Sequence, residues 1–134
     1  MTLTDAGPLV ALVASDQPDH RRCLTALLLL SPPLVTTMAV FTEAMHLLGR
    51  GGWRLQDALW QFERRGRLAI HDLGPAELAR CYELMQRYRD LPMDLADATL
   101  VAAAEQLGER RVFTLDAHFA IYRSADGRAF ELLP

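Results

Sequence analysis

The chain has 134 residues, a length at which one domain around one hydrophobic core is expected. Its 17 acidic residues outnumber 14 basic residues, so the net charge is −3 at pH 7, which argues against a protein that holds nucleic acid through an overall basic surface. All the basic residues are Arg, a bias that suits bidentate phosphate contacts and that a GC-rich genome explains equally well. Hydrophobic residues make up 51% of the sequence, as in folded globular domains.

Neither a membrane helix nor a secretory signal is expected. The longest apolar stretch, 24–30, is far short of the roughly 20 residues that span a bilayer, and it ends at Ser31. The N-terminus leads straight to Asp5 without a basic and then an apolar segment, so the expected location is the cytoplasm. Cys23 and Cys81 have no metal-binding or redox spacing and are predicted to be buried free thiols.

Short apolar runs alternate with longer helical patterns, which is typical of an α/β domain with a mostly parallel sheet. Five strands are predicted, at 3–4, 33–36, 68–71, 111–114 and 129–132. Six helices are predicted between them, at 8–14, 18–30, 38–49, 54–65, 75–89 and 95–107. Gly49, Gly66 and Gly108 are interpreted as the stop signals of three of these helices. No repeat or linker interrupts the pattern, which predicts one domain over residues 1–134.

Two acids follow predicted strands, and a third lies in a predicted apolar helix. Asp5 follows the first strand and Asp116 follows the fourth, so both carboxylates belong to one edge of the sheet if the strands are parallel. Glu43 lies in the apolar segment 38–48, which predicts a carboxylate near a buried helix face, where it needs a partner. An exposed Glu on an ordinary helix is the alternative.

Asp94 and Asp97 stand three residues apart at the start of an Ala-rich helix that is apolar nearly all round. Asp94 follows Pro92 and is a good N-cap candidate, and Asp97 could complement the helix dipole. Since Asp97 lies a turn further in, among core-like residues, a ligand role is favoured for it. Hard divalent cations such as Mg²⁺ and Mn²⁺ prefer carboxylates and water, and in nucleases and polymerases such metals activate water and neutralise charge on phosphate oxygens.

The order and context of these acids resemble the PIN-domain family, and in particular the small proteins that include VapC-type toxins. The resemblance covers essentially the whole chain and rests on four motifs. These are Asp5 before small residues and an apolar helix, Glu43 six residues after Thr37, Asp97 opening the Ala-rich helix, and Asp116 after Thr114 and before Phe119. The chain departs from the commonest pattern in having Ala6-Gly7, rather than Ser or Thr, directly after Asp5.

The resemblance implies a three-layer α/β/α fold with a five-stranded parallel sheet and a Mg²⁺- or Mn²⁺-dependent endoribonuclease site. By carry-over, Asp5, Glu43, Asp97 and Asp116 are the catalytic acids. Asp5 and Asp97 are the direct metal ligands, and Asp116, also a candidate ligand, completes the site with Glu43. Thr114 supplies a supporting hydroxyl, and Asp94 is an accessory or capping residue. Members of this family are commonly homodimers and are often inhibited by a small antitoxin, so both partners are expected.

An acidic site that cleaves RNA needs positive charge nearby to attract phosphates. The densest basic stretch consists of Arg50, Arg54, Arg64, Arg65 and Arg67. These residues are the RNA-binding candidates, and a solvated helix face that offsets nearby acids is the alternative. In the same stretch, Trp53, Trp60 and Phe62 are predicted to be core or dimer-interface residues rather than base-stacking platforms.

Two other functions compete with the ribonuclease. A PIN-like module that binds RNA or protein without cleaving it is the alternative, and the intact set of acids favours the enzyme. A phosphatase with Asp5 as a covalent nucleophile would need an Asp two residues later, where Gly7 stands, and a catalytic Lys, which the sequence lacks.

Overall fold

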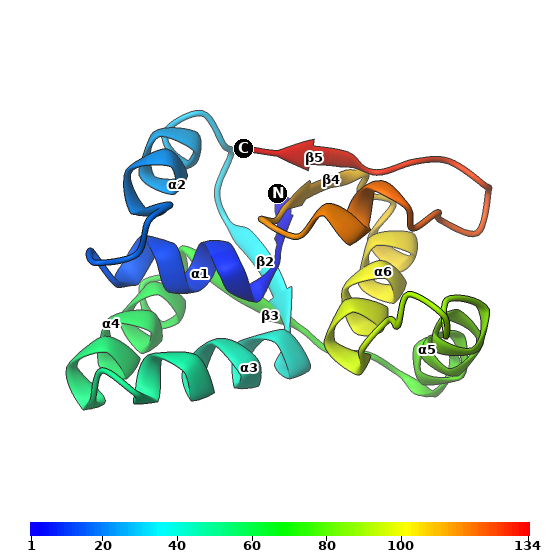
Figure 1. Cartoon of the computed structure of the whole chain (residues 1–134), viewed down its shortest axis with the longest axis horizontal. Coiled ribbons are helices and arrows are strands. Elements are labelled where there is room, and N and C mark those ends of the chain that lie inside the picture. Colours follow the sequence, from blue (N-terminus) through cyan, green and yellow to red (C-terminus); the bar gives the residue numbers. More distant parts are fainter.

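The computed structural model describes all residues, 1–134. Five strands form one parallel sheet in the order β3-β2-β1-β4-β5 (Figure 1). Their bounds are Thr2–Thr4 (β1), Leu34–Thr37 (β2), Leu68–His71 (β3), Arg111–Phe113 (β4) and Glu131–Leu133 (β5). The strands are short and rich in β-branched residues, and the three central ones are buried on both faces, as parallel sheets require.

Six α-helices cover the sheet and give the predicted three-layer α/β/α fold. Helices α1 to α4 gather on one side of the strands, and α5 and α6 lie on the other (Figure 1). Their bounds are Ala6–Val13 (α1), His20–Leu27 (α2), Met38–Gly49 (α3), Trp53–Arg64 (α4), Pro75–Arg87 (α5) and Leu95–Leu107 (α6). A short 3₁₀ helix, η1 (Ala117–Ala120), which the sequence analysis did not predict, follows β4.

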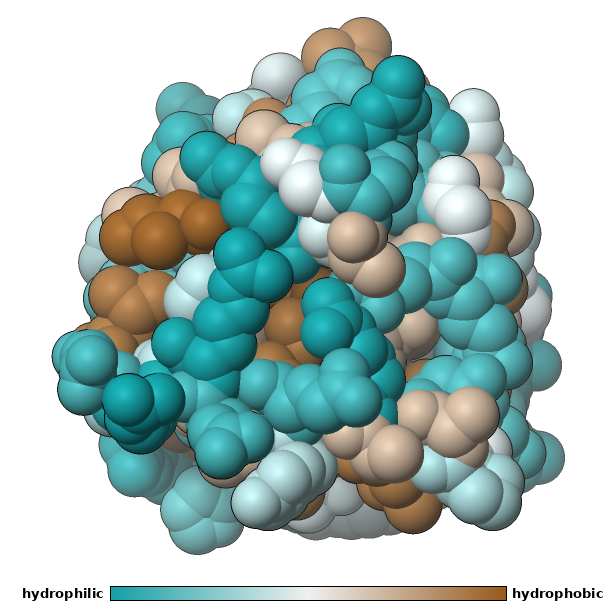
Figure 2. Space-filling view, turned by 90° about the vertical axis from the view of Figure 1, so that its right-hand side faces the viewer, coloured by the Kyte–Doolittle hydropathy of each residue, from teal (hydrophilic) through white to brown (hydrophobic).

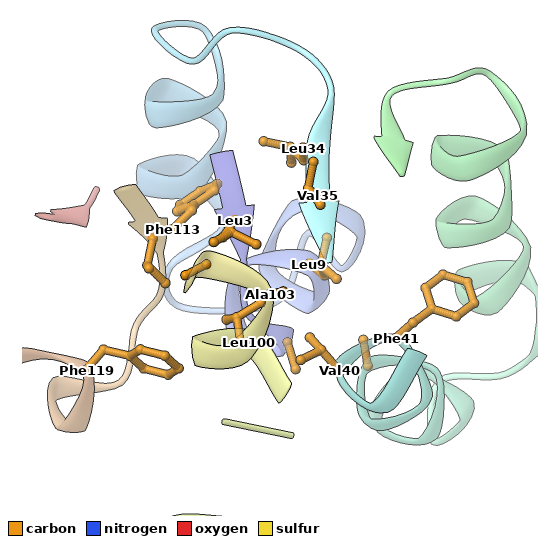
Figure 3. Close-up of a cluster of buried hydrophobic side chains, with 14 of the residues drawn as sticks. Leu3, Leu9, Leu34, Val35, Val40, Phe41, Leu100, Ala103, Phe113 and Phe119 are labelled. Atoms are coloured by element: carbon orange, nitrogen blue, oxygen red, sulfur yellow. The ribbon is translucent and has the colours of Figure 1, made fainter. Parts of the chain in front are cut away.

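One cluster of 30 buried hydrophobic residues lies between these layers (Figure 3). Leu3, Val35 and Phe113 from the three central strands meet side chains of α1 and α3 on one face and of α6 on the other. Helix α6 is buried from Asp97 to Ala104, and its run of Ala residues allows close packing against neighbouring elements. Both Cys residues are free and buried, as predicted.

Several predicted boundaries were wrong. Helix α2 ends at Leu27 rather than at residue 30, and β5 begins at Glu131 rather than at residue 129. Gly108 ends α6 in a left-handed conformation and Gly66 follows α4 with a positive φ, as predicted. Gly49 is instead the last helical residue of α3, and a positive φ occurs only three residues later, at Gly52.

The outer side of the α5–α6 layer is mainly hydrophilic, with separate apolar areas (Figure 2). An ion pair joins its two helices, in which the guanidinium of Arg80 donates three hydrogen bonds, of 2.9, 3.0 and 3.3 Å, to the carboxylate of Glu105. None of the helices combines the length and apolarity that a membrane crossing requires.

Candidate active site

A pocket of about 450 Å³ opens at the carboxyl edge of the sheet. All five acids singled out from the sequence line it, together with apolar and small residues from α1, α3 and the loop after β4. The acids are Asp5, Glu43, Asp94, Asp97 and Asp116. Residues up to 111 positions apart in the chain therefore meet here, because parallel strands all end at one edge of the sheet.

Strand register positions Asp5. Thr4 pairs with Phe113 in the sheet, and the Asp5 amide donates to the Phe113 carbonyl at 2.9 Å, which brings Asp5 beside Thr114. The Asp5 Oδ1 accepts from the Ala6 amide and caps α1, and Oδ2 accepts from the Thr114 hydroxyl, both at 2.8 Å. Thr114 thus supplies a hydroxyl to Asp5, although Ala6 and Gly7 stand where related proteins commonly have Ser or Thr directly after this Asp. Asp5 is only 7% exposed, and both of its oxygens are held by donors.

Helix α6 brings Asp94 and Asp97 to the same pocket. Asp94 is exposed and is the N-cap of α6, as predicted, since its Oδ1 accepts from the Asp97 amide at 2.8 Å. The Asp97 carboxylate is 7% exposed, and its Oδ2 accepts from the phenol of Tyr122 at 2.9 Å. The hydroxyls of Thr99 and Thr37 lie 2.7 Å apart, which ties the start of α6 to the end of β2.

Glu43 and Asp116 complete the ring of acids from more exposed positions. The buried face of α3 consists of Val40, Phe41, Ala44 and Leu48, so Glu43 is exposed, and the prediction that it lies near a buried face was wrong. It reaches the pocket from the solvent side of α3. The Asp116 side chain is 41% exposed and caps η1 by accepting from the His118 amide at 2.9 Å. The His118 Nδ1 lies 3.5 Å from the same carboxylate.

Burial and mutual repulsion make several of these carboxylates hard to ionise. Burial raises the pKa of Asp97 from its usual value of 3.8 to about 7; Asp94, Asp5 and Asp116 add repulsion, and the Tyr122 hydrogen bond opposes the rise. Burial also raises the pKa of Asp5, against the effect of hydrogen bonds from Thr114 and Ala6. The pKa of Glu43 is raised by partial desolvation of its carboxyl group where it reaches the pocket, and by three neighbouring acids. A cation in the pocket would relieve this unfavourable charge.

The donor set fits a hard divalent cation that binds few protein groups directly. As the side chains stand, no three acidic, histidine or cysteine residues lie close enough together to hold one metal ion. The three-carboxylate set of Asp5, Asp97 and Asp116 is therefore not preassembled as ligands of a single ion. Mg²⁺ commonly binds through one or two carboxylates and keeps several waters, so the two buried acids, Asp5 and Asp97, are sufficient first ligands.

The predicted basic rim does not line the pocket. Arg50, Arg54, Arg64, Arg65 and Arg67 are all exposed, form no ion pair, and are absent from the pocket wall. The reason is the direction of α3, which begins at the sheet edge that carries the site and leads away from it, so the stretch after its C-terminus lies at its other end. In the same stretch Trp53 is 66% exposed and so is not a core residue, while its place in a dimer interface stays a prediction; Leu59 is the core residue of α4.

Sequence reasoning missed Tyr122, which lies 25 positions from the acid it contacts. Its fully buried ring packs against Phe119 and Tyr88, each with ring centroids 5.1 Å away. The spacing of three aromatic residues between 113 and 122 indicates a buried segment, but no pattern in the sequence predicts that this phenol reaches Asp97.

A parallel α/β sheet with polar residues beyond its strand ends defines the open α/β class, whose ligands bind at that edge. Within this class the match is specific, since the sequence profile of the PIN domain matches residues 2–124. The chain belongs to the PIN-domain family, as the four motifs indicated.

Individual relatives cover nearly the whole chain. The sequence is 26% identical over 134 residues to ribonuclease VapC26 of Mycobacterium tuberculosis, covering 98% of this chain and 99% of the relative. The structure is similar to that of VapC20 of Mycobacterium tuberculosis, which is described as a toxin that cleaves the sarcin–ricin loop. The TM-score is 0.83 and the sequence identity is 18%, and the match covers 90% of this chain and 94% of VapC20. The structure is also similar to a toxin–antitoxin complex from Klebsiella pneumoniae, with a TM-score of 0.66 and 19% identity over 87% of each chain.

Proposed function

We propose that this protein is a Mg²⁺- or Mn²⁺-dependent endoribonuclease that hydrolyses RNA phosphodiester bonds. The observation that carries the proposal is the convergence of five acids from separate parts of the chain on one pocket, with two of them buried at the cost of a raised pKa. Buried carboxylates that repel one another destabilise a fold unless a bound cation or a proton neutralises their charge. Membership in the PIN-domain family and the whole-length similarity to a VapC ribonuclease support the same activity.

The proposal gives each acid a role. Asp5 and Asp97 hold the cation, because they are the two buried carboxylates and are fixed by neighbouring donors. Glu43 and Asp116, which are more exposed, bind through water and orient the attacking water molecule. Thr114 links two of the acids, since it donates to Asp5 and accepts from the Asp116 amide at 3.0 Å. When bound, the cation lowers the pKa of its water and neutralises charge on the phosphate oxygens.

RNA cleavage by the purified protein tests this function. Wild type should cleave single-stranded RNA with Mg²⁺ or Mn²⁺ and not with EDTA, and Asp5→Asn and Asp97→Asn should each lose at least about 100-fold in rate. Asp90→Asn is the matched control, since Asp90 is an exposed acid with no hydrogen bond or ion pair. If wild type binds RNA but cleaves none with either metal, the protein is a binding module rather than a nuclease.

We further propose that the protein is the toxin of a toxin–antitoxin pair. An apolar groove of about 560 Å³ between α2 and α4 is lined by Leu27, Leu30 and Phe62, with Arg65 and Arg67 at its margin. Leu28, which also lines the groove, and the adjacent Leu29 are each 85% exposed, which is unfavourable in water without a partner. An antitoxin segment with apolar and acidic residues would fit this surface. Co-purification with the product of an adjacent gene, lost in Leu28→Glu/Leu29→Glu, tests the pairing.

Homodimer formation, a cytoplasmic location and a single-domain organisation stay predictions. Size-exclusion chromatography with light scattering tests the first. A dimer that persists in Leu28→Glu/Leu29→Glu would show that the second copy does not bind at the groove between α2 and α4.

A further inference from the structure

The two oxygens of the Asp97 carboxylate differ, because only one of them accepts a hydrogen bond within the protein. Its Oδ2 accepts the hydrogen bond from Tyr122, whereas Oδ1 has no hydrogen-bond partner in the protein and is not sealed from solvent. Because Asp97 lines the acidic pocket, Oδ1 is the oxygen available to a ligand there.

The phenol that occupies Oδ2 is held rigidly. The Tyr122 ring has no solvent exposure and packs edge-on against Phe119, with an interplanar angle of 78°, and against Tyr88 at 60°. The following residue is anchored as well, since the Arg123 amide donates to the Tyr88 hydroxyl at 3.0 Å and its guanidinium donates to three backbone carbonyls. If the hydroxyl left Asp97, it would therefore stay buried and have no hydrogen-bond partner, which is energetically costly.

We propose that Tyr122 is a positioning residue that makes Asp97 a one-oxygen ligand and thereby selects small cations over Ca²⁺. The proposal deepens, and rests on, the metal-dependent function proposed above. Mg²⁺ binds in a compact octahedron with one or two carboxylates and several waters, which a single oxygen of Asp97 satisfies. Ca²⁺ takes six to eight oxygens and commonly uses both oxygens of a carboxylate, and the hydrogen bond from the buried phenol to Oδ2 disfavours this bidentate mode at Asp97.

Tyr122→Phe tests this role, because it removes the hydroxyl and keeps the ring in the aromatic cluster. Tyr88→Phe is the matched control: it removes the other hydroxyl of that cluster, which bonds to the Arg123 amide and to none of the acids. Affinities for Mn²⁺ by electron paramagnetic resonance and for Ca²⁺ by calorimetry are the readouts, so the test does not depend on cleavage. Loss of an outer hydrogen bond should weaken Mn²⁺ binding by about 10-fold.

The expected result is that Tyr122→Phe lowers the ratio of Mn²⁺ to Ca²⁺ affinity at least about 10-fold and that Tyr88→Phe leaves it unchanged. An unchanged ratio in a folded Tyr122→Phe variant, or an equal change in both variants, overturns the proposal. A wild type that binds Mn²⁺ but cleaves no RNA refutes the nuclease function and leaves this proposal to be decided by the affinities.

A measurement on the wild type gives an independent answer if the variant does not fold. With tyrosine labelled at Cζ, the Tyr122 signal should keep the isotope splitting of a slowly exchanging hydroxyl when Mg²⁺ saturates the protein. Loss of that splitting on Mg²⁺ binding would mean that the phenol releases Oδ2, and the proposal would fail.

Discussion

The buried carboxylate of Asp97 should destabilise the metal-free protein at alkaline pH, and Asp97→Asn should reverse this. The folded protein keeps a proton on Asp97 up to a pKa of about 7, whereas the unfolded chain releases it near 3.8. The folded state therefore binds more protons between these values, so this group's contribution is most favourable below pH 4 and is lost as the pH rises through 7.

The size of the effect follows from the same two values. A rise from 3.8 to about 7 corresponds to roughly 4 kcal/mol of unfolding free energy, at about 1.4 kcal/mol for each pH unit. Since part of the repulsion is shared with the neighbouring acids, we expect Asp97→Asn to gain about 2–3 kcal/mol at pH 8.5. For a chain of this length that is a rise in Tm of roughly 6–12 °C.

Thermal unfolding in EDTA at pH 5 and pH 8.5 measures the effect. Asn has the shape of Asp, and its amide oxygen can still accept from Tyr122, so the substitution mainly removes the charge. The gain at pH 5 should be roughly 40% of the gain at pH 8.5, because at pH 5 the unfolded chain has already released the proton that folded Asp97 keeps. Asp90→Asn should change Tm little at either pH. An equal gain at both pH values, or a loss at pH 8.5, would refute the assignment of a repelled, buried carboxylate.

Three further outcomes are expected. Mg²⁺ at 100 times its Kd should stabilise the wild type by about 2.7 kcal/mol in thermal unfolding and Asp5→Asn far less, and an equal gain in both would place the cation elsewhere. Glu105→Gln should lower the unfolding free energy by about 1–2 kcal/mol in urea, because the three hydrogen bonds from Arg80 lose their charged acceptor. An unchanged unfolding free energy would show that this ion pair does not stabilise the fold. Gly108→Ala should lower the unfolding free energy by about 1 kcal/mol in the same assay, because φ is +65° there, a backbone conformation that Ala rarely adopts. The new methyl group meets no neighbouring atom, so no clash adds to this cost. A variant as stable as the wild type would contradict the left-handed conformation.

Local chemistry explains why most of the acidic site was predictable. Asp5, Asp94 and Asp116 each follow a strand or turn and cap the helix that comes next, and capping is a preference of short acidic side chains that a sequence displays. Once the strands are expected to be parallel, their ends share one edge, and the acids that follow them converge. Glu43 was harder, because its position on a helix surface depends on which face of α3 the core covers.

The sequence by itself determined the α/β alternation, the parallel sheet and the acids that meet at its edge, because these follow from residue periodicity and from capping within a few positions of the chain. Only the tertiary structure decided that Tyr122 reaches Asp97, that the arginine-rich stretch after α3 lies away from the pocket, and that one oxygen of Asp97 has no hydrogen bond within the protein. These features depend on the direction and packing of elements far apart in the chain, and no local preference of a side chain encodes them.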